Sequence, residues 1–358
     1  MPPKPVLSIV FCTLILMTSC AVPVQKDLVP DAEAKSLSEV FRRVNPAVVI
    51  VLTKEFAYSR MEPGATVTRG GFGSGVVISK DGLVMTAAHV VQVADAVAVR
   101  FQDGRTLEAK VIGASMQADV ALLRLDSVPY DLVTVELGNS NLVDIGDEVF
   151  VVGAPYGVDH TLTVGYLSGR RMPRSACRQL VPIEFLQTDA AINQGNSGGP
   201  LFSMDGKLIG IVSHIMTRSG GSEGLGFATS SNSAKALLLE QKSFWIGLDA
   251  YFVSGELATA LNVPQDAGLL VQRIANGSPG AEMGLTPGTI PVKVGREDIL
   301  LGGDIILEVQ GQTVSTDVER TCRIRDTIGA LKAGSRIEMK VLRRGEIITL
   351  HTQKSDQN

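Results

Sequence analysis

The sequence is poor in cysteine, histidine and aromatic residues, and these shortages narrow the chemistry that it can carry. The chain has four cysteines, four histidines and one tryptophan, and aromatic residues make up 5% of it. It contains no C-x-x-C and no H-E-x-x-H pattern, so a zinc site has no support. Two cysteines, Cys177 and Cys322, lie far from the N-terminus. A disulfide between them would be feasible, but two separate buried thiols are favoured.

The chain also lacks a long apolar run and an excess of positive charge. No apolar stretch reaches the roughly 18 residues of a membrane-spanning helix. The formal net charge is −4 and no long basic run is present, so nucleic acid is not expected as a partner. A chain of 358 residues is long enough for about two or three domains. Abundant glycine with few aromatic residues suits many short strands joined by turns.

The first twenty residues have the pattern of an export signal. An apolar run over residues 6–17 is too short to span a bilayer comfortably. Its end, Leu16-Met17-Thr18-Ser19-Cys20, resembles the lipobox of bacterial lipoproteins. We therefore expect a signal over residues 1–19, acylation of Cys20, and a tether over residues 20–36. The alternative is an ordinary secretory signal cleaved near Ala21. Either signal takes the mature chain out of the cytosol, and we expect it in the bacterial cell envelope, facing the periplasm and anchored to a membrane by its lipid.

Residues 37–240 have the pattern of a mainly β module. Apolar residues at helical spacing predict a short helix over residues 37–44, which Asn45-Pro46 ends. Short apolar runs then recur between turns, without the long helices that alternate with strands in a parallel sheet. The hairpin signals Asp81-Gly82 and Asp103-Gly104 favour antiparallel pairing, and hence an antiparallel barrel or sandwich.

A serine surrounded by glycines is the strongest chemical signal in the chain. Ser197 lies in Asn193-Gln194-Gly195-Asn196-Ser197-Gly198-Gly199-Pro200. Glycines let the backbone bend so that its N–H groups point inward, as an oxyanion site requires. The pattern thus predicts Ser197 as an acyl-transfer nucleophile, with the N–H groups of Gly195 and Ser197 as oxyanion donors. The alternatives are an ordinary turn and the elbow of α/β-hydrolases, which needs a helix after the serine.

Two further residues could supply Ser197 with a base and that base with a carboxylate partner. His89 closes an apolar strand in Thr86-Ala87-Ala88-His89, and Asp119 opens another in Ala118-Asp119-Val120. Alone, the histidine could be structural and the aspartate could cap a turn. The chain order His, Asp, Ser is that of the chymotrypsin-type triad, whereas α/β-hydrolases run Ser, Asp, His. The hypothesis of an α/β-hydrolase would need His214 or His351 as the catalytic base.

These motifs together resemble the HtrA family of trypsin-like serine proteases, over about residues 37 to 353. The matching segments are Gly73–Ile78, Thr86–His89, Ala118–Leu123, Leu186–Asn193, Gly195–Leu201 and Gly226–Ala228. The resemblance implies a chymotrypsin-like double β-barrel with the cleft between the barrels, and no metal or cofactor. It implies that His89 takes the Ser197 proton, that Asp119 orients the imidazole, and that Asn196 joins the oxyanion hole. It also implies a homotrimer formed near Phe41.

The same resemblance suggests how substrates are selected and how activity is controlled. It puts Ala191 at the floor of the primary pocket and Ser213-His214-Ile215 along its wall. The floor carries no acidic side chain, so we expect small or medium aliphatic residues before the cut rather than Arg or Lys. His214 departs from an apolar wall. Gly169–Glu184 and Thr217–Gly224 are candidate regulatory loops; solvated basic loops are the alternative.

Residues 241–358 resemble a PDZ domain, a small α/β fold. The loop Trp245-Ile246-Gly247-Leu248 would bind the carboxylate of a peptide C-terminus, while the peptide adds a strand to the sheet. One departure is Thr289–Leu301, for which we expect an extra hairpin. The sequence thus favours an envelope endoprotease that acts on unfolded or damaged proteins. The alternatives are a chaperone or scaffold with an inactive protease fold, and an esterase of the α/β-hydrolase type.

Overall fold

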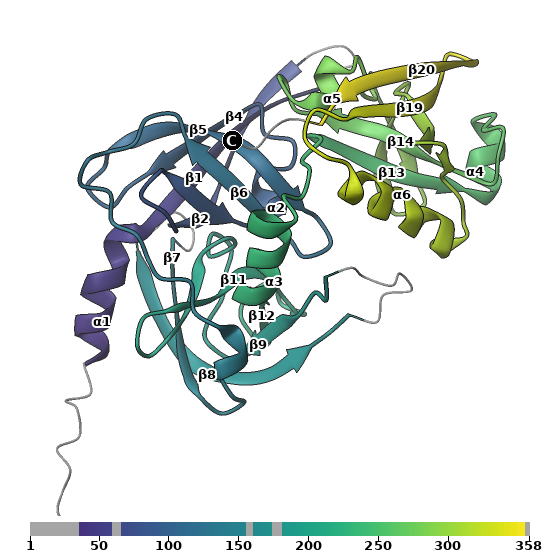
Figure 1. Ribbon diagram of the computed structural model, residues 1–358. Helices are drawn as coiled ribbons and strands as arrows, with labels where there is room; N and C mark the ends of the chain where they lie inside the picture. Colours follow the sequence, from purple (N-terminus) through teal and green to yellow (C-terminus); the bar gives the residue numbers. More distant parts are fainter. Residues whose placement is uncertain (1–35, 59–65, 155–159, 174–180, 355–358) are drawn as a thin grey trace, which may run out of the picture. The chain divides into compact units, whose positions relative to one another are not determined.

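The computed structural model describes residues 36–58, 66–154, 160–173 and 181–354. The predicted signal, Cys20, most of the tether and Cys177 lie outside the described residues. Among the described helices, none is both long enough and apolar enough to cross a membrane. The description below therefore concerns the part that begins at Ser36 (Figure 1).

Six antiparallel strands form a first closed barrel in the order β1-β2-β3-β6-β5-β4. They are β1 (Val48–Tyr58), β2 (Thr66–Val77), β3 (Leu83–Thr86), β4 (Ala96–Arg100), β5 (Thr106–Ser115) and β6 (Val120–Leu125). The predicted turns at Gly82 and Gly104 join β2 to β3 and β4 to β5, and both glycines have positive φ. The barrel is filled mainly by valine, leucine and alanine, which suit a pleated, fully buried surface.

A helix precedes this barrel, as predicted. Helix α1 (Leu37–Val44) begins at a capping box in which Ser36 and Glu39 bond each other's backbone N–H. The short 3-10 turn η1 (Asn45–Ala47) follows it, with Pro46 at its start. Val40 and Val44 are buried, and a Cβ added at Gly206 would touch both, so α1 packs on the turn that contains Gly206.

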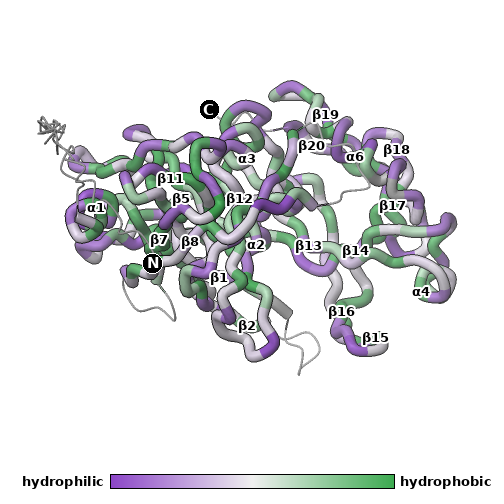
Figure 2. Tube along the Cα trace, turned by 90° about the horizontal axis from the view of Figure 1, so that it is seen from below, coloured by the Kyte–Doolittle hydropathy of each residue, from purple (hydrophilic) through white to green (hydrophobic). Residues whose placement is uncertain are grey.

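A second closed barrel has the order β10-β11-β12-β9-β8-β7. Its strands are β7 (Glu148–Gly153), β8 (Thr161–Arg171), β9 (Phe185–Thr188), β10 (Pro200–Ser203), β11 (Leu208–Ile215) and β12 (Gly226–Ser230). A 3-10 turn, η2 (Ser140–Leu142), precedes it, and helical residues Ser231–Lys235 (α3) and Ala236–Glu240 (η4) close the module. Hydrophobic residues lie along strands such as β7 and β11 (Figure 2). The fold is thus a mainly β double barrel, as expected.

The C-terminal part is built on one antiparallel sheet with short helices. The sheet order is β13-β14-β17-β19-β20, and β18 pairs with β17. The elements are β13 (Leu248–Ser254), α4 (Gly255–Ala260), β14 (Ala267–Ile274), α5 (Pro279–Glu282), β17 (Ile305–Val309), β18 (Gln312–Thr313), α6 (Val318–Ala330), β19 (Arg336–Arg343) and β20 (Glu346–Gln353). This arrangement fits a PDZ domain, and β13 lies at the edge of the sheet.

The C-terminal part contains one predicted feature and departs from another prediction. The extra hairpin is present as β15 (Ile290–Val294) and β16 (Glu297–Leu301), which pair with each other. Gln272 of β14 holds it, because its side chain bonds both the N–H and the C=O of Leu300 at 2.7 and 3.1 Å. The expectation of a free thiol at Cys322 was wrong, since this residue of α6 is disulfide-bonded.

Candidate active site

His89 and Asp119 are brought together by the ends of two neighbouring strands. β3 ends at Thr86, and the short helix α2 (Ala88–Val91) then carries His89. Asp119 directly precedes β6, which pairs with β3. Its φ of 51° lies in the left-handed region, where aspartate is tolerated better than most residues. This conformation turns the carboxylate toward α2.

The carboxylate of Asp119 accepts hydrogen bonds from three donor groups. Nδ1 of His89 lies 2.9 and 2.8 Å from its two oxygens, and the His89 backbone N–H donates to Oδ1 at 3.0 Å. The hydroxyl of Ser213 donates to Oδ2 at 2.6 Å. Burial alone would raise the pKa of Asp119, but the bonds from His89 and Ser213 hold it below the ordinary value. The ionised carboxylate therefore fixes the proton of His89 on Nδ1 and leaves Nε2 as a base.

Ser197 lies beside this pair but is not bonded to it. Its hydroxyl donates to the carbonyl of Ser213 at 3.3 Å. Within the described residues no hydrogen bond joins Ser197 to His89, so the predicted contact of the imidazole with the hydroxyl is not made in this arrangement. The side chain of His89 is 46% exposed, which leaves room for that contact to form. Catalytic hydrogen bonds often tighten only when substrate is bound.

The backbone around Ser197 offers two N–H groups rather than three. Gly195 and Ser197 donate no backbone hydrogen bond to any described residue, whereas the N–H of Asn196 donates to the carbonyl of Asn193 at 3.0 Å. Asn196 is therefore not a free donor here, contrary to its expected part in the oxyanion hole. Gly195 adopts a φ of 103°, which a residue with a side chain rarely does.

A buried serine, Ser74 of β2, holds this loop in place. Its N–H donates to the carbonyl of Ser197 at 2.8 Å and its hydroxyl to that of Gly195 at 2.7 Å. The same hydroxyl accepts from the N–H of Ala154 at 3.0 Å. Sequence reasoning assigned Ser74 no role, although a serine directly before the apolar run that begins at Gly75 was a signal for one. Gly198 is also constrained, since a Cβ there would lie 2.3 Å from the Ser74 carbonyl.

Comparison with known proteins agrees with this geometry. The model of the trypsin-like peptidase domain matches residues 73–211. A probable periplasmic serine endoprotease, DegP-like, from Halomonas elongata is 39% identical over 297 residues, which are 80% of this chain and 57% of that protein. A protein of the same name from Pseudomonas fulva is 38% identical over 78% of this chain and 54% of its own length. The chain thus spans about half the length of these curated relatives.

The solved structures include the HtrA-type protease AlgW with tripeptide. It is 30% identical in sequence, with a TM-score of 0.51, and the match covers 90% of this chain and 97% of that one. The chain belongs to the HtrA family of serine proteases. A second structure, AlgW with decapeptide, has 29% identity and a TM-score of 0.51 over 98% of its length.

The residues expected to form the primary pocket of this HtrA protein differ in exposure. Ala191 and His214 are exposed, Ile215 is half-buried and Ser213 is 2% exposed. The nearby carboxylate of Asp189 accepts a hydrogen bond from the N–H of Tyr166 at 2.6 Å. That carboxylate is thus bound to the backbone of β8.

The two candidate regulatory loops are partly described. In the first, Arg170 bonds Glu184 at 2.7 Å and also the carbonyls of Ser140 and Val143, so it is a structural contact rather than a solvated charge. Arg174 and Arg178 lie outside the described residues. In the second, Glu223 accepts hydrogen bonds from the N–H groups of residues 218 and 219 and closes the loop on itself.

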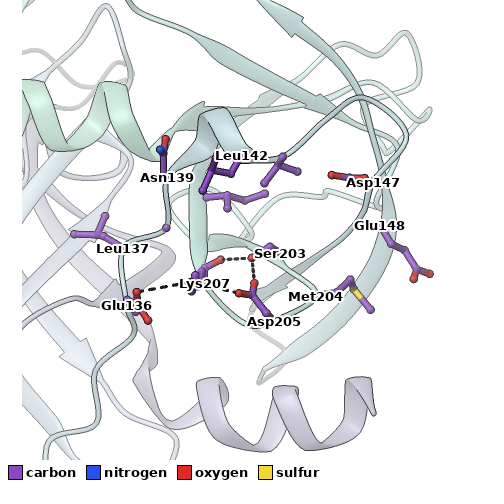
Figure 3. Close-up of a pocket in the computed structure, with 13 residues that line it drawn as sticks. Glu136, Leu137, Asn139, Leu142, Asp147, Glu148, Ser203, Met204, Asp205 and Lys207 are labelled. Atoms are coloured by element: carbon purple, nitrogen blue, oxygen red, sulfur yellow. Dashed lines mark hydrogen bonds and ion pairs between the residues drawn. The ribbon is translucent and has the colours of Figure 1, made fainter. Parts of the chain in front are cut away.

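A cavity of about 540 Å³ lies away from the triad of this HtrA protein and contains none of the predicted site residues. Its lining comes from the segments around η2, the start of β7 and the β10–β11 turn (Figure 3). Lys207 on its rim is paired with Glu136 and Asp205. Two of the four acidic side chains in the described lining, Glu136 and Asp205, are thus already paired with a cation of the protein.

The loop expected to bind a peptide carboxylate is in contact with Gln92, the residue that follows α2. The indole N–H of Trp245 donates to the carbonyl of Gln92 at 3.1 Å, and the Gln92 side chain donates to the carbonyl of Leu248 at 3.0 Å. The carbonyls of Ile246 and Gly247 accept hydrogen bonds from Gly280 and Ala275 of their own domain. Within the described residues, the N–H groups of Ile246 and Gly247 donate to no backbone carbonyl, as a carboxylate-binding loop requires.

Proposed function

We propose that the chain is a serine endopeptidase that cuts unfolded or damaged proteins in the bacterial cell envelope. The observation that carries this proposal is the orientation of the His89 imidazole by Asp119 at 2.8–2.9 Å, beside a serine whose loop presents two unengaged N–H groups. His89 would take the proton of Ser197 as the hydroxyl attacks the peptide carbonyl, and would then protonate the leaving amine. Asp119 would stabilise the imidazolium that forms between these steps.

The N–H groups of Gly195 and Ser197 would stabilise the oxyanion of the tetrahedral intermediate. Removing one such donor typically costs about 3 kcal/mol of transition-state stabilisation. Before the attack, the hydroxyl of Ser197 must leave the Ser213 carbonyl and turn toward Nε2 of His89. The observed arrangement would therefore be a resting one.

Substrate selection would combine two sites. A pocket formed by Ala191, Ser213, His214 and Ile215 would take small or medium aliphatic side chains. The loop Trp245–Leu248 would bind peptide C-termini while the peptide extends the sheet at β13. The open edge of β13 supports this mode of binding, and the solved relatives whose titles name a tripeptide and a decapeptide support peptides as ligands.

The proposed location is supported by the N-terminal part of the sequence and by the names of the relatives, and the proposed assembly by the family resemblance. We propose a signal over residues 1–19, a lipid on Cys20 that anchors the protein to a membrane, and a trimer that forms near Phe41. The relatives are named periplasmic. A disulfide at Cys322 supports an oxidising compartment such as the periplasm, because cytosolic thiols are kept reduced.

A second candidate function is a peptide-binding chaperone with an inactive protease fold. The observation that favours it is the hydrogen bond of the Ser197 hydroxyl to the Ser213 carbonyl instead of to His89. Both candidates use the same peptide-binding surfaces and differ only in whether Ser197 reacts.

The two candidates are separated by comparing the mature protein with its Ser197→Ala variant. Each is incubated with an unfolded protein and with a serine-reactive fluorophosphonate, with and without peptides that end in a free carboxylate. Ser203→Ala, a serine of β10 outside the site, is the matched control. Cleavage and labelling that disappear only in Ser197→Ala support the protease. Equal results for wild type and Ser197→Ala under all conditions support the chaperone.

Separately, Cys20→Ser should release the protein from membranes.

A further inference from the structure

A second imidazole, that of His214, lies next to the proposed triad. Residues 208–213 of β11 are buried, but a bulge between Val212 and His214 interrupts the pairing with β12, and His214 is exposed. Bulges next to active sites redirect side chains. The carbonyl of Ser213 contacts the Ser197 hydroxyl. His214, the next residue, therefore lies where an extended substrate would run alongside the nucleophile.

The hydrogen bonds around Ser213 fix the proton of His214. Nδ1 of His214 lies 2.9 Å from the Ser213 hydroxyl oxygen, and that hydroxyl lies 2.6 Å from Oδ2 of Asp119. A hydroxyl has one proton and an ionised carboxylate can only accept, so Ser213 must donate to Asp119. Nδ1 of His214 must then be the donor to Ser213. The neutral imidazole therefore carries its proton on Nδ1, and Nε2 is an acceptor.

The ring of His214 is held in a fixed orientation. It stacks on Phe227, with ring centres 5.0 Å apart and planes 17° apart, and meets the edge of Phe185 at 5.6 Å. Within the described residues, Nε2 has no hydrogen-bond partner. Partial burial of the ring lowers the pKa of His214; the carboxylate of Asp119 raises it and His89 lowers it further. The net shift is downward, so the ring is neutral at pH 7.5. A rigid aromatic ring thus presents a single unpaired acceptor.

We propose that His214 is a specificity-determining residue that accepts a hydrogen bond from a substrate side chain on the acyl side of the scissile bond. The inference rests on the proposed proteolytic function. At one substrate position before the primary-pocket residue, Nε2 favours a side chain with a hydroxyl, amide or ammonium donor. An apolar side chain of the same shape would bind less well there. Unlike the aliphatic preference of the primary pocket, this selection depends on one nitrogen atom.

The test measures kcat/KM at pH 7.5 for peptides that differ only by Thr against Val, or by Asn against Leu, at each of the three positions before the primary-pocket residue. Wild type should prefer the donor at one position by about fivefold, the value of one ordinary hydrogen bond. His214→Phe keeps the stacking on Phe227 but has no acceptor, so the preference should vanish. His214→Gln restores a side-chain acceptor and should recover part of it. Met216→Ala, on the same strand, should leave the ratio unchanged.

Ratios between matched peptides cancel any effect of a variant on catalysis itself. A wild type without donor preference, a preference that persists in His214→Phe, or a preference for Asp and Glu would overturn the proposal. The tautomer gives an independent test, because nitrogen NMR of the ring should show a protonated Nδ1; a protonated Nε2 in the neutral ring would also overturn it. If wild type neither cleaves nor labels with fluorophosphonate, the proposed function fails, and the NMR result still decides how His214 is bonded.

Discussion

Replacing Ser74 by alanine should damage both stability and activity, because one hydroxyl joins two barrels. Ser74 is fully buried, donates to the carbonyl of Gly195 and accepts from the N–H of Ala154. The alanine variant leaves both backbone groups buried and unpaired, at about 1–3 kcal/mol for each. We expect the free energy of unfolding to fall by about 2–6 kcal/mol.

The effect of Ser74→Ala on activity should exceed what partial unfolding explains. The Gly195 carbonyl belongs to the residue whose N–H is the proposed oxyanion donor, so its release lets that donor move. Loss of a whole donor lowers kcat by about 10²–10³-fold, and we expect at least about tenfold for a displaced one. The assay combines urea unfolding with kcat/KM and fluorophosphonate labelling at a temperature where the variant is folded.

Ser79→Ala is the matched control for this prediction. Its hydroxyl accepts one hydrogen bond, from the N–H of Leu83 at 3.0 Å, in a half-buried turn of the same barrel. It should cost about 1 kcal/mol and leave kcat/KM unchanged. If Ser74→Ala lost stability but kept wild-type kcat/KM, the role of Ser74 in holding the oxyanion loop would be refuted.

Three further changes have defined outcomes. Arg343 bonds the buried carboxylate of Asp304 through two nitrogens, each at 2.7 Å. Asp304→Ala removes this partner and should lower the free energy of unfolding in urea by about 3–5 kcal/mol. An unchanged unfolding midpoint would contradict this. Hydrogen bonds from Thr316 lower the pKa of Asp266 from 3.8 to about 2, so its stabilisation is complete above pH 4 and is lost as pH falls through 2. Asp266→Asn should flatten the pH dependence of thermal unfolding in that window, with no change in slope above it. Gly198→Ala should abolish fluorophosphonate labelling, because the new methyl group would meet Ser74 and Ala87 at 2.3 and 2.7 Å; wild-type labelling would show that the loop has other conformations.

Local turn signals predicted an antiparallel barrel or sandwich, whereas the double barrel and the pairing of His89 with Asp119 were predicted through the resemblance to the HtrA family and the chain order of the triad. Turn dipeptides such as Asp103-Gly104 specify a hairpin, and the order of His, Asp and Ser distinguishes between unrelated protease folds. The extra hairpin at residues 290–301 was predicted in the same way, from the length of an insertion between two recognisable segments.

Long-range partners could not be predicted, since a sequence pattern gives the type of a residue but not its neighbour. Nothing local indicates that Ser74 bonds Gly195 across 121 positions, or that Gln92 meets Trp245. The backbone bond of Asn196 to Asn193, which removes an expected oxyanion donor, depends on one peptide orientation. The disulfide of Cys322 was missed because cysteine spacing alone does not specify pairing.

At Asp119 the backbone conformation is strained, but the proposed chemistry requires the side chain at this position. Most residues with a side chain avoid its φ of 51°, at about 1–2 kcal/mol for the left-handed conformation. Glycine would relax this strain but remove the carboxylate, so screening variants for heat resistance alone should enrich inactive proteins at this position. Selection for thermal stability must therefore be run together with selection for turnover.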